Sequence, residues 1–304
     1  MITRDIDAFL AQARACAPDF GPATAKAAFL VSPDGFARAD ESAGDNRYMA
    51  GEAAGFDAAQ AVAQHRALQR ALSEVVPTIC FPGDGDAPDG LFPNNVYATV
   101  PGRLIVGRMR HAVRRREAAR ADIRGFFRDA MGYAERDLST QPHPCELTGA
   151  LVVDRARGLG FCGLSERCDE AGARLMHEAF GLRATLLFDL APGEYHANVV
   201  LAVLAGRMAL LCPDGFADAR VVAAIEGLYA PHARRLSTAE QAAFAGNAIA
   251  LSGDAVWISA TAAAALAQDS RGAVAAAGFV VRSVPLDAIE AAGGSLRCCV
   301  AEIF

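Results

Sequence analysis

The sequence predicts an α/β protein assembled from a repeated ββαβ unit, and two observations carry this prediction. Pairs of short apolar runs joined by a turn occur four times along the 304 residues, and each pair is followed by a helical pattern and another extended segment. Polar residues beside these pairs recur at a nearly constant spacing. Repetition of this kind favours one repeat-built catalytic domain over residues 1–304 rather than two unrelated domains.

The four hairpins are compact. Their joining turns contain Pro-Gly, Asp-Arg-Ala-Arg, Ala-Gly and Ser-Gly-Asp, which are plausible hairpin connectors. The paired apolar runs are residues 96–100 with 103–107, 150–153 with 158–162, 199–204 with 208–212, and 249–251 with 255–258. The helices expected after them cover residues 116–130, 168–180, 218–228 and 261–267.

The first and last apolar runs lack a hairpin of their own. If residues 27–31 pair with residues 298–304, they complete a fifth unit, with a helix over residues 57–73 and a third strand over residues 76–81. Pairing of the N- and C-terminal strands closes the repeats into a ring and protects the strand edges. The sequence therefore predicts a five-bladed αβ propeller with a period of about 51 residues.

One polar residue marks the same place in each unit. These residues are Asn95, Glu146, His196, Asn247 and Cys298, separated by 51, 50, 51 and 51 positions. A unit repeated around an axis brings all five onto one central surface. A cysteine, a histidine and a glutamate there can act as a nucleophile, an acid–base partner and an orienting carboxylate.

Two connections are longer than a hairpin turn requires. Residues 32–55 and 82–93 are both rich in Gly, Pro, Asp and Asn. Long loops in compact domains commonly serve as lids or binding loops, although irregular surface is an equal alternative here.

The composition excludes several function classes. With 53% hydrophobic and 21% charged residues, the chain can bury a substantial core. The net charge is −6 and residues 114–116 form the one basic block, so no nucleic acid partner is expected. The longest apolar stretch, near residues 255–267, is too short for a membrane span, and the N-terminus lacks a signal-peptide pattern. We expect a cytoplasmic protein that does not bind membranes.

The eight cysteines show no CxxC pair and no zinc spacing. Most lie in apolar runs, so we expect buried, reduced thiols. No metal site is predicted.

Several segments resemble the amidinotransferase and guanidine-modifying superfamily, which includes arginine deiminases, dimethylarginine hydrolases and succinylarginine dihydrolases. Residues 293–304 resemble its nucleophile segment, and residues 92–95, 146–149, 164–167 and 195–198 resemble its other motifs, in the right order. The subgroup of citrulline-utilisation hydrolases is most similar, since its N-terminal loop also resembles residues 32–46. The resemblance covers residues 27–304 and implies the five-bladed αβ propeller, or pentein, fold.

The resemblance implies a role for each catalytic residue. Cys298 would be the nucleophile, with Cys299 a weaker choice because strand alternation turns only one of the two toward the site. His196 would be the general acid and base. Glu146 would orient the amidino or ureido nitrogens of the substrate, although a carboxylate in such a constellation can also hold the imidazole in place.

The resemblance also implies a set of substrate-binding residues. Arg167 would bind a substrate carboxylate, with Arg114 as a second candidate. Asn95 and Phe92 belong to the guanidine-side segment, and Asn247 is expected to fix the turn near the site more than to contact substrate.

Three positions depart from the superfamily pattern. Asn95 stands where arginine deiminases and dimethylarginine hydrolases carry an acid, which favours a substrate that is neutral at the reacting carbon or passes through a neutral stage. Leu147 stands where the family usually has Gly, and Ala39 stands where the subgroup has a polar residue.

The resulting hypothesis is a cysteine-dependent hydrolase that converts a citrulline- or arginine-type amino acid to an ornithine-type product and ammonia, with no cofactor. The alternatives are an amidinotransferase, a dimethylarginine-type hydrolase and a non-catalytic propeller that binds a ligand. The expected partner is a small amino-acid substrate, and a homodimer is one option for the assembly.

Overall fold

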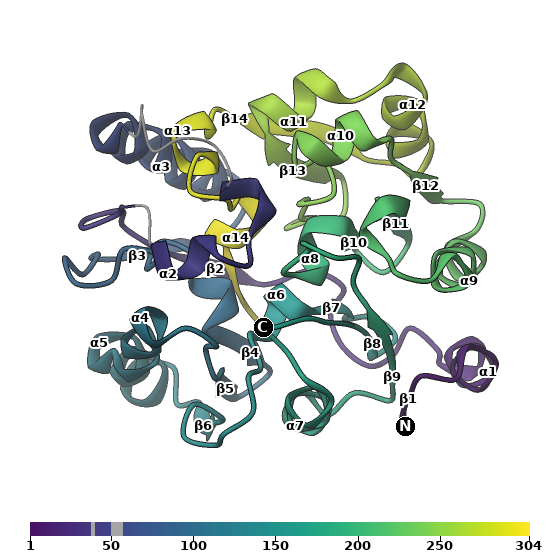
Figure 1. Ribbon diagram of the computed structural model, residues 1–304, viewed down its shortest axis with the longest axis horizontal. Helices are drawn as coiled ribbons and strands as arrows, with labels where there is room; N and C mark the ends of the chain where they lie inside the picture. The colour runs from purple at the N-terminus through teal and green to yellow at the C-terminus, as the bar shows by residue number, and fades with distance from the viewer. Residues whose placement is uncertain (38–39, 50–56) are drawn as a thin grey trace.

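The structure is a computed structural model that describes residues 1–37, 40–49 and 57–304. In that part of the chain there are five separate small sheets, surrounded by helices (Figure 1). Four of them mix parallel and antiparallel strands, and the fifth is a parallel pair. The α/β class is as predicted. Ala39 and residues 50–55 of the predicted loop at 32–55 lie outside the described residues.

Three of the sheets share one strand order. The first and second strands are antiparallel, and the second and third are parallel. These sheets are β4 (Tyr97–Val100), β5 (Arg103–Val106) and β6 (Ala134–Asp137); β7 (Leu151–Asp154), β8 (Leu159–Leu164) and β9 (Ala184–Asp189); and β10 (Leu201–Leu204), β11 (Met208–Leu211) and β12 (Ala233–Arg235). The short strand β1 (Ile2–Thr3) pairs in parallel with β9. The three predicted hairpins at residues 96–107, 150–162 and 199–212 are therefore confirmed.

The fourth predicted hairpin is reduced to a single bridge. Residues 249–251 form no strand, and Ile249 pairs with Trp257 alone. The sheet there consists of β13 (Ala255–Ser259) and β14 (Val280–Val284), which are parallel. The Ser252 hydroxyl bonds to the Asp254 carboxylate at 2.6 Å in the turn between the two segments.

The fifth sheet joins the two ends of the described chain. Its strands are β15 (Ala301–Ile303), β2 (Ala27–Val31) and β3 (Thr78–Phe81). β15 is antiparallel to β2, and β2 is parallel to β3, as the sequence predicts. The Phe29 side chain is fully buried there and makes edge-to-face contacts with Phe81 and Phe127.

The longer helices lie at the periphery of the view in Figure 1. They are α1 (Ile6–Ala15), α3 (Ala58–Ser73), α7 (Glu170–Phe180), α9 (Ala219–Tyr229) and α12 (Gln268–Ala276), with α11 (Ala260–Ala265) before the last. α3, α7 and α9 match the predicted helices, and aspartates 57, 169 and 218 cap their N-termini. α12 was not expected. Within the described ranges, no helix has the length and apolar character needed to cross a bilayer.

The prediction of one continuous helix over residues 116–130 is wrong. The segment divides into a 3₁₀ turn (Arg116–Ala119), α5 (Ala121–Gly125) and a π-helical turn (Phe126–Ala130). The Glu117 carbonyl accepts the Tyr97 hydroxyl, and Arg120 leaves the helical region with ψ 105° while its guanidinium reaches the Pro82 carbonyl. Burial of Glu117 therefore interrupts the helix.

The remaining elements are short. They are α2 (Asp40–Ala43), η1 (Arg47–Met49), η2 (Pro93–Asn95), α4 (Ala112–Arg115), α6 (Leu147–Ala150), α8 (Ala197–Val200), η5 (Pro213–Gly215), α10 (Thr238–Ala242), α13 (Asp287–Glu290) and α14 (Leu296–Cys299). In Figure 1, α6, α8 and α14 lie toward the middle of the molecule, inside the ring of longer helices.

Replacing Phe29 tests the sheet that joins the chain ends. We expect Phe29→Ala to lower the free energy of unfolding by about 3–5 kcal/mol, because it removes a buried aromatic ring and leaves a cavity. Val280→Ala, at a side chain that is 60% exposed, is the control and should change it by less than about 0.5 kcal/mol. Urea unfolding measures both. Equal effects of the two variants would contradict this account of the sheet.

Candidate active site

Each of the five repeat positions lies in a short turn that leads into a sheet. Glu146 and His196 are the residues at the N-termini of α6 and α8, Asn95 ends η2, and Cys298 lies in α14. Asn247 lies in the irregular segment before the Ile249 bridge. All five side chains are buried. The repeat thus carries polar side chains into the interior, where each needs a partner.

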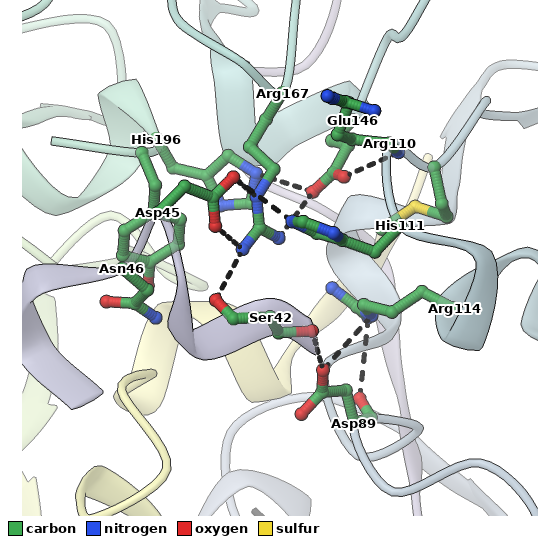
Figure 2. A network of polar contacts seen from close by, with 12 residues as sticks. Ser42, Asp45, Asn46, Asp89, Arg110, His111, Arg114, Glu146, Arg167 and His196 are labelled. Carbon is green, nitrogen blue, oxygen red and sulfur yellow. Dashed lines mark hydrogen bonds and ion pairs between the residues drawn. The ribbon is translucent and has the colours of Figure 1, made fainter. Parts of the chain in front are cut away.

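Glu146 and His196 form the central hydrogen bond. The His196 Nε2 lies 2.8 Å from the Glu146 Oε2, and both side chains are fully buried. The other carboxylate oxygen, Oε1, accepts the Arg110 backbone N–H at 3.0 Å (Figure 2). Glu146 therefore orients the imidazole, which is the second of the two roles that the sequence left open.

The charges around Glu146 keep it ionised. Burial alone would raise its pKa, but Arg167, whose Nη1 lies 3.4 Å away, and the hydrogen bond with His196 hold the pKa well below its ordinary value. Burial lowers the pKa of His196, and Glu146 opposes this only in part. The pair is therefore a carboxylate and a neutral imidazole at neutral pH.

This arrangement leaves one imidazole nitrogen able to accept a proton. Because Nε2 carries the hydrogen that Glu146 accepts, Nδ1 of the neutral ring is unprotonated. Nδ1 of His196 is buried and has no hydrogen-bond partner among the described residues. A buried, unpartnered lone pair on an oriented imidazole has the properties of a general base.

Asn95 and His196 meet at Gly149. A Cβ atom at this glycine would lie 2.6 Å from the Asn95 Oδ1 and 2.7 Å from the His196 Cε1, which is too close for any side chain. The Asn95 Oδ1 is also buried without a partner in the described chain. Two buried polar atoms without partners at one place indicate a position where a ligand would supply the missing hydrogen bonds.

Cys298 is held by Asn247. The Asn247 Nδ2 donates to the Cys298 Sγ at 3.4 Å and to the Asn198 carbonyl at 2.9 Å, while its Oδ1 accepts the Arg297 backbone N–H. Burial raises the pKa of Cys298, and the hydrogen bonds with Ser295 and Asn247 offset only part of this. The resting side chain is therefore a thiol, and Asn247 fixes the turn as the sequence predicts.

A cavity with about 300 Å³ of empty space opens onto the Cys298 side chain. Its lining includes four of the predicted site residues, Phe92, Asn95, Arg114 and Arg167. Phe92 forms one wall and packs so closely on Gly294 that a Cβ atom there would lie 2.7 Å from its ring.

Arg167 and Arg114 lie on the polar side of the cavity, and each is already paired. Arg167 binds Asp45 with two hydrogen bonds, from Nε at 2.7 Å and from Nη2 at 2.6 Å (Figure 2). Arg114 binds Glu117 in the same way, at 2.8 and 2.7 Å. A run of arginines is more often the solvent-exposed start of a helix. Here the Arg114 side chain is buried, while its two neighbours in the basic block are exposed.

The first of the two predicted loops contributes Ser42, Asn46 and Met49 to the lining of this cavity. Asp45 holds Arg167, and the Ser42 hydroxyl binds the Asp89 carboxylate at 2.7 Å (Figure 2). The Asn46 Nδ2 donates to the Gly293 carbonyl. Asp89 itself comes from the second predicted loop, at residues 82–93. Both long loops therefore line the candidate site.

Sequence reasoning missed Ser42 and Asp89, which line the cavity, and Asp45, which pairs with Arg167. Each lies in a loop that holds several acidic residues, and none occupies a repeat position. No sequence signal separates these residues from their exposed neighbours. In the described ranges, no group of three His, Cys, Asp or Glu side chains is arranged to hold a metal ion.

Alkylation of Cys298 tests the state of the thiol. Because burial raises its pKa, we expect the rate of modification by iodoacetamide to keep rising beyond pH 9 in the free protein. Peptide mass spectrometry at a series of pH values measures this rate. Asn247→Ala should move the inflection to still higher pH, since it removes the hydrogen bond to sulfur. A rate that levels off below about pH 8 would contradict the burial argument.

Comparison with known proteins identifies the class of protein. The sequence matches the family model of eukaryotic N,N-dimethylarginine dimethylhydrolases over residues 32–304. The chain is therefore a hydrolase of the class that acts on carbon–nitrogen bonds in guanidino compounds. Within that class it belongs to the N,N-dimethylarginine dimethylhydrolase family, which confirms the predicted superfamily. No curated protein matches the sequence significantly.

Solved structures share the fold. The N-terminal domain of ArgZ, an arginine dihydrolase of the ornithine–ammonia cycle in cyanobacteria, superimposes with a TM-score of 0.79 and 21% identity, covering 91% of this chain and 97% of that one. A dimethylarginine dimethylaminohydrolase with an S-methyl-L-thiocitrulline adduct gives 0.70 and 19%, covering 92% and 100%. AgrE, bound to ornithine and NAD⁺, gives 0.78 and 22%, with 91% of this chain but 39% of AgrE covered.

Proposed function

We propose that this protein hydrolyses a guanidino or ureido amino acid through a covalent intermediate on Cys298. The observation that carries the proposal is the bond between Glu146 and His196, which leaves the His196 Nδ1 unprotonated and without a partner among the described residues. Asn95, which meets His196 at Gly149, lines one pocket together with Cys298. Membership in the N,N-dimethylarginine dimethylhydrolase family supports it.

The chemistry needs two transfers of a proton. The Cys298 sulfur bonds to the guanidino or ureido carbon, and its proton passes through His196 Nδ1 to the departing nitrogen as that carbon–nitrogen bond breaks. Water then gives a proton to Nδ1 and its oxygen bonds to the carbon. The carbon–sulfur bond breaks, and the proton returns to the sulfur. Glu146 stays ionised and stabilises the imidazolium that forms in each step.

Arg167 would bind the substrate carboxylate, with Arg114 as its neighbour. The bidentate pair with Asp45 is the geometry that an amino-acid carboxylate would adopt on the same guanidinium. We infer that the substrate displaces Asp45 when it binds. Asn95 would place its free Oδ1 against an N–H group of the reacting end, and Phe92 would cover the aliphatic chain.

The proposed substrates are citrulline or arginine, with an ornithine-type product and ammonia. An amide at position 95 can accept a hydrogen bond without supplying a negative charge, so it suits a neutral ureido group as well as a cationic guanidinium. The arginine dihydrolase activity of ArgZ, a protein of the same fold, gives this proposal a precedent. Dimethylarginine, named by the family, is the second candidate.

The finer fold and setting also belong to this proposal. We infer that the five sheets are the blades of one αβ propeller, since the strands from both chain ends share a sheet. Residues 1–304 would then form a single catalytic domain. All eight cysteines are free, which fits a reducing compartment such as the cytoplasm.

Replacing the two adjacent cysteines tests the nucleophile. Cys298→Ser should lower kcat by roughly 10³-fold or more while the protein keeps its fold, because a serine hydroxyl is a far weaker nucleophile here. The matched control is Cys299→Ala, whose sulfur points away to the Ser295 carbonyl and should not react. Full activity in the first variant, or equal losses in both, would exclude Cys298 as the nucleophile.

A screen for released ammonia tests the substrate. We expect release from citrulline or arginine among a set that also includes their N-acyl forms, methylarginines and agmatine. Two ammonia molecules per arginine would indicate two successive hydrolyses, and one would indicate a single step. Release of dimethylamine from dimethylarginine alone would favour the reaction that the family name gives. Turnover only with an added amine acceptor would indicate an amidinotransferase, and binding without turnover would indicate a non-catalytic protein.

A further inference from the structure

A second, narrow cavity lies behind the catalytic turns, and the proposed reaction does not use it. Thr148 and Asn198 line it, and each follows a catalytic residue by two positions, Glu146 and His196 respectively. Arg155, Arg297 and Glu302 bring charge to the same cavity. It therefore has polar side chains in a largely apolar lining, and it is distinct from the pocket that Arg167 and Arg114 line.

Arg155 is a buried cation without an anion. Its side chain lies against the rings of Phe180 and Phe304, and its Nη1 donates to the Thr99 carbonyl at 3.0 Å. No carboxylate lies within ion-pair distance of it in the described chain, unlike the buried Arg114 and Arg167. A guanidinium has five N–H donors, so most of its donors have no protein partner among the described residues.

The other charges in the cavity do not neutralise Arg155. Glu302 is already bonded to the Arg297 Nη2 at 2.9 Å, so these two residues cancel. Burial lowers the pKa of Arg155 to about 10, and Glu302 offsets this only in part. Arg155 therefore has no carboxylate partner among the described residues, and a bound anion would supply one.

The Asn198 amide supplies a second, independent indication. Its Nδ2 and Oδ1 are both buried and have no hydrogen-bond partner among the described residues, although the side chain is only 3% exposed. An amide N–H that lines the same cavity as an unpaired guanidinium forms with it a donor set suited to an oxyanion. Buried amide atoms normally find partners, so these two call for a ligand or ordered water.

We propose that this second cavity binds a small planar oxyanion of the carboxylate and bicarbonate class. The guanidinium of Arg155 offers two parallel N–H donors to two oxygens of such an anion, and the Asn198 amide offers a third. A rounder tetrahedral anion fits this planar fork less well.

The cavity shares its wall with the nucleophile. Asn247 bonds to the Asn198 carbonyl, to the Cys298 sulfur and to the Arg297 backbone. The anion would therefore sit one layer behind the catalytic turns, and it could come from bulk solution or from the carbon released when a ureido group is hydrolysed completely. Both sources present the same planar oxygen pair.

Titration of the full-length protein with bicarbonate and with acetate tests the proposal. We expect a saturable rise in melting temperature with either anion, with sodium chloride used to match ionic strength, and a smaller rise with sulfate. Half-saturation at a clearly lower concentration of bicarbonate than of acetate would identify the reaction-derived anion as the better ligand, and similar values would identify a general carboxylate site.

Three variants make the outcome decisive. Arg155→Met should fold, because it replaces an unpaired buried cation with an apolar side chain. It should raise the anion concentration at half-saturation by roughly tenfold or more. Asn198→Asp should remove binding by supplying an internal carboxylate. Arg167→Met, in the active site, should leave the rise unchanged. The absence of a saturable rise in the unaltered protein would overturn the proposal, as would an equal rise in Arg155→Met or a rise lost in Arg167→Met.

Discussion

The ionised state of Glu146 is the constraint on which the site depends. A fully buried carboxylate keeps its charge only because Arg167, the His196 hydrogen bond and the Arg110 backbone N–H surround it. That charge in turn fixes which imidazole nitrogen carries the hydrogen. The three elements that supply these groups come from different sheets or loops. The His196 imidazole therefore has the properties of a base only once the chain has folded.

The repeat explains why such a costly arrangement is stable. Each unit delivers one short turn to the interior, and neighbouring turns satisfy one another: Asn247 binds the turn of Cys298, and Gly149 lets Asn95 approach His196. Polar groups contributed singly would each remain unpaired, whereas here Glu146 pairs with His196 and Asn247 with Cys298. Atoms that the network leaves free then mark positions for ligands.

The sequence allowed the repeat, the end-to-end strand pairing and the five central residues to be predicted, because hairpin patterns and spacing are local properties of the chain. It did not reveal that the segment at 116–130 is interrupted, since the cause is the Tyr97 hydroxyl from a distant strand. Asp45 and Asp89 were missed because a loop carboxylate gains its role only from the arginine that the fold places beside it. The role proposed for Arg155 could not be predicted for the same reason, because the fold decides whether a carboxylate lies beside it.

The pairing of Asp45 with Arg167 has a consequence for any measured affinity. If the incoming carboxylate must take the guanidinium from Asp45, only the fraction of molecules in which that bond is open can accept it. The apparent dissociation constant then equals the intrinsic one divided by that fraction. Selectivity among amino acids would remain a property of the pocket, while the affinity for all of them would depend on the strength of the Asp45–Arg167 bond. The two could therefore evolve separately.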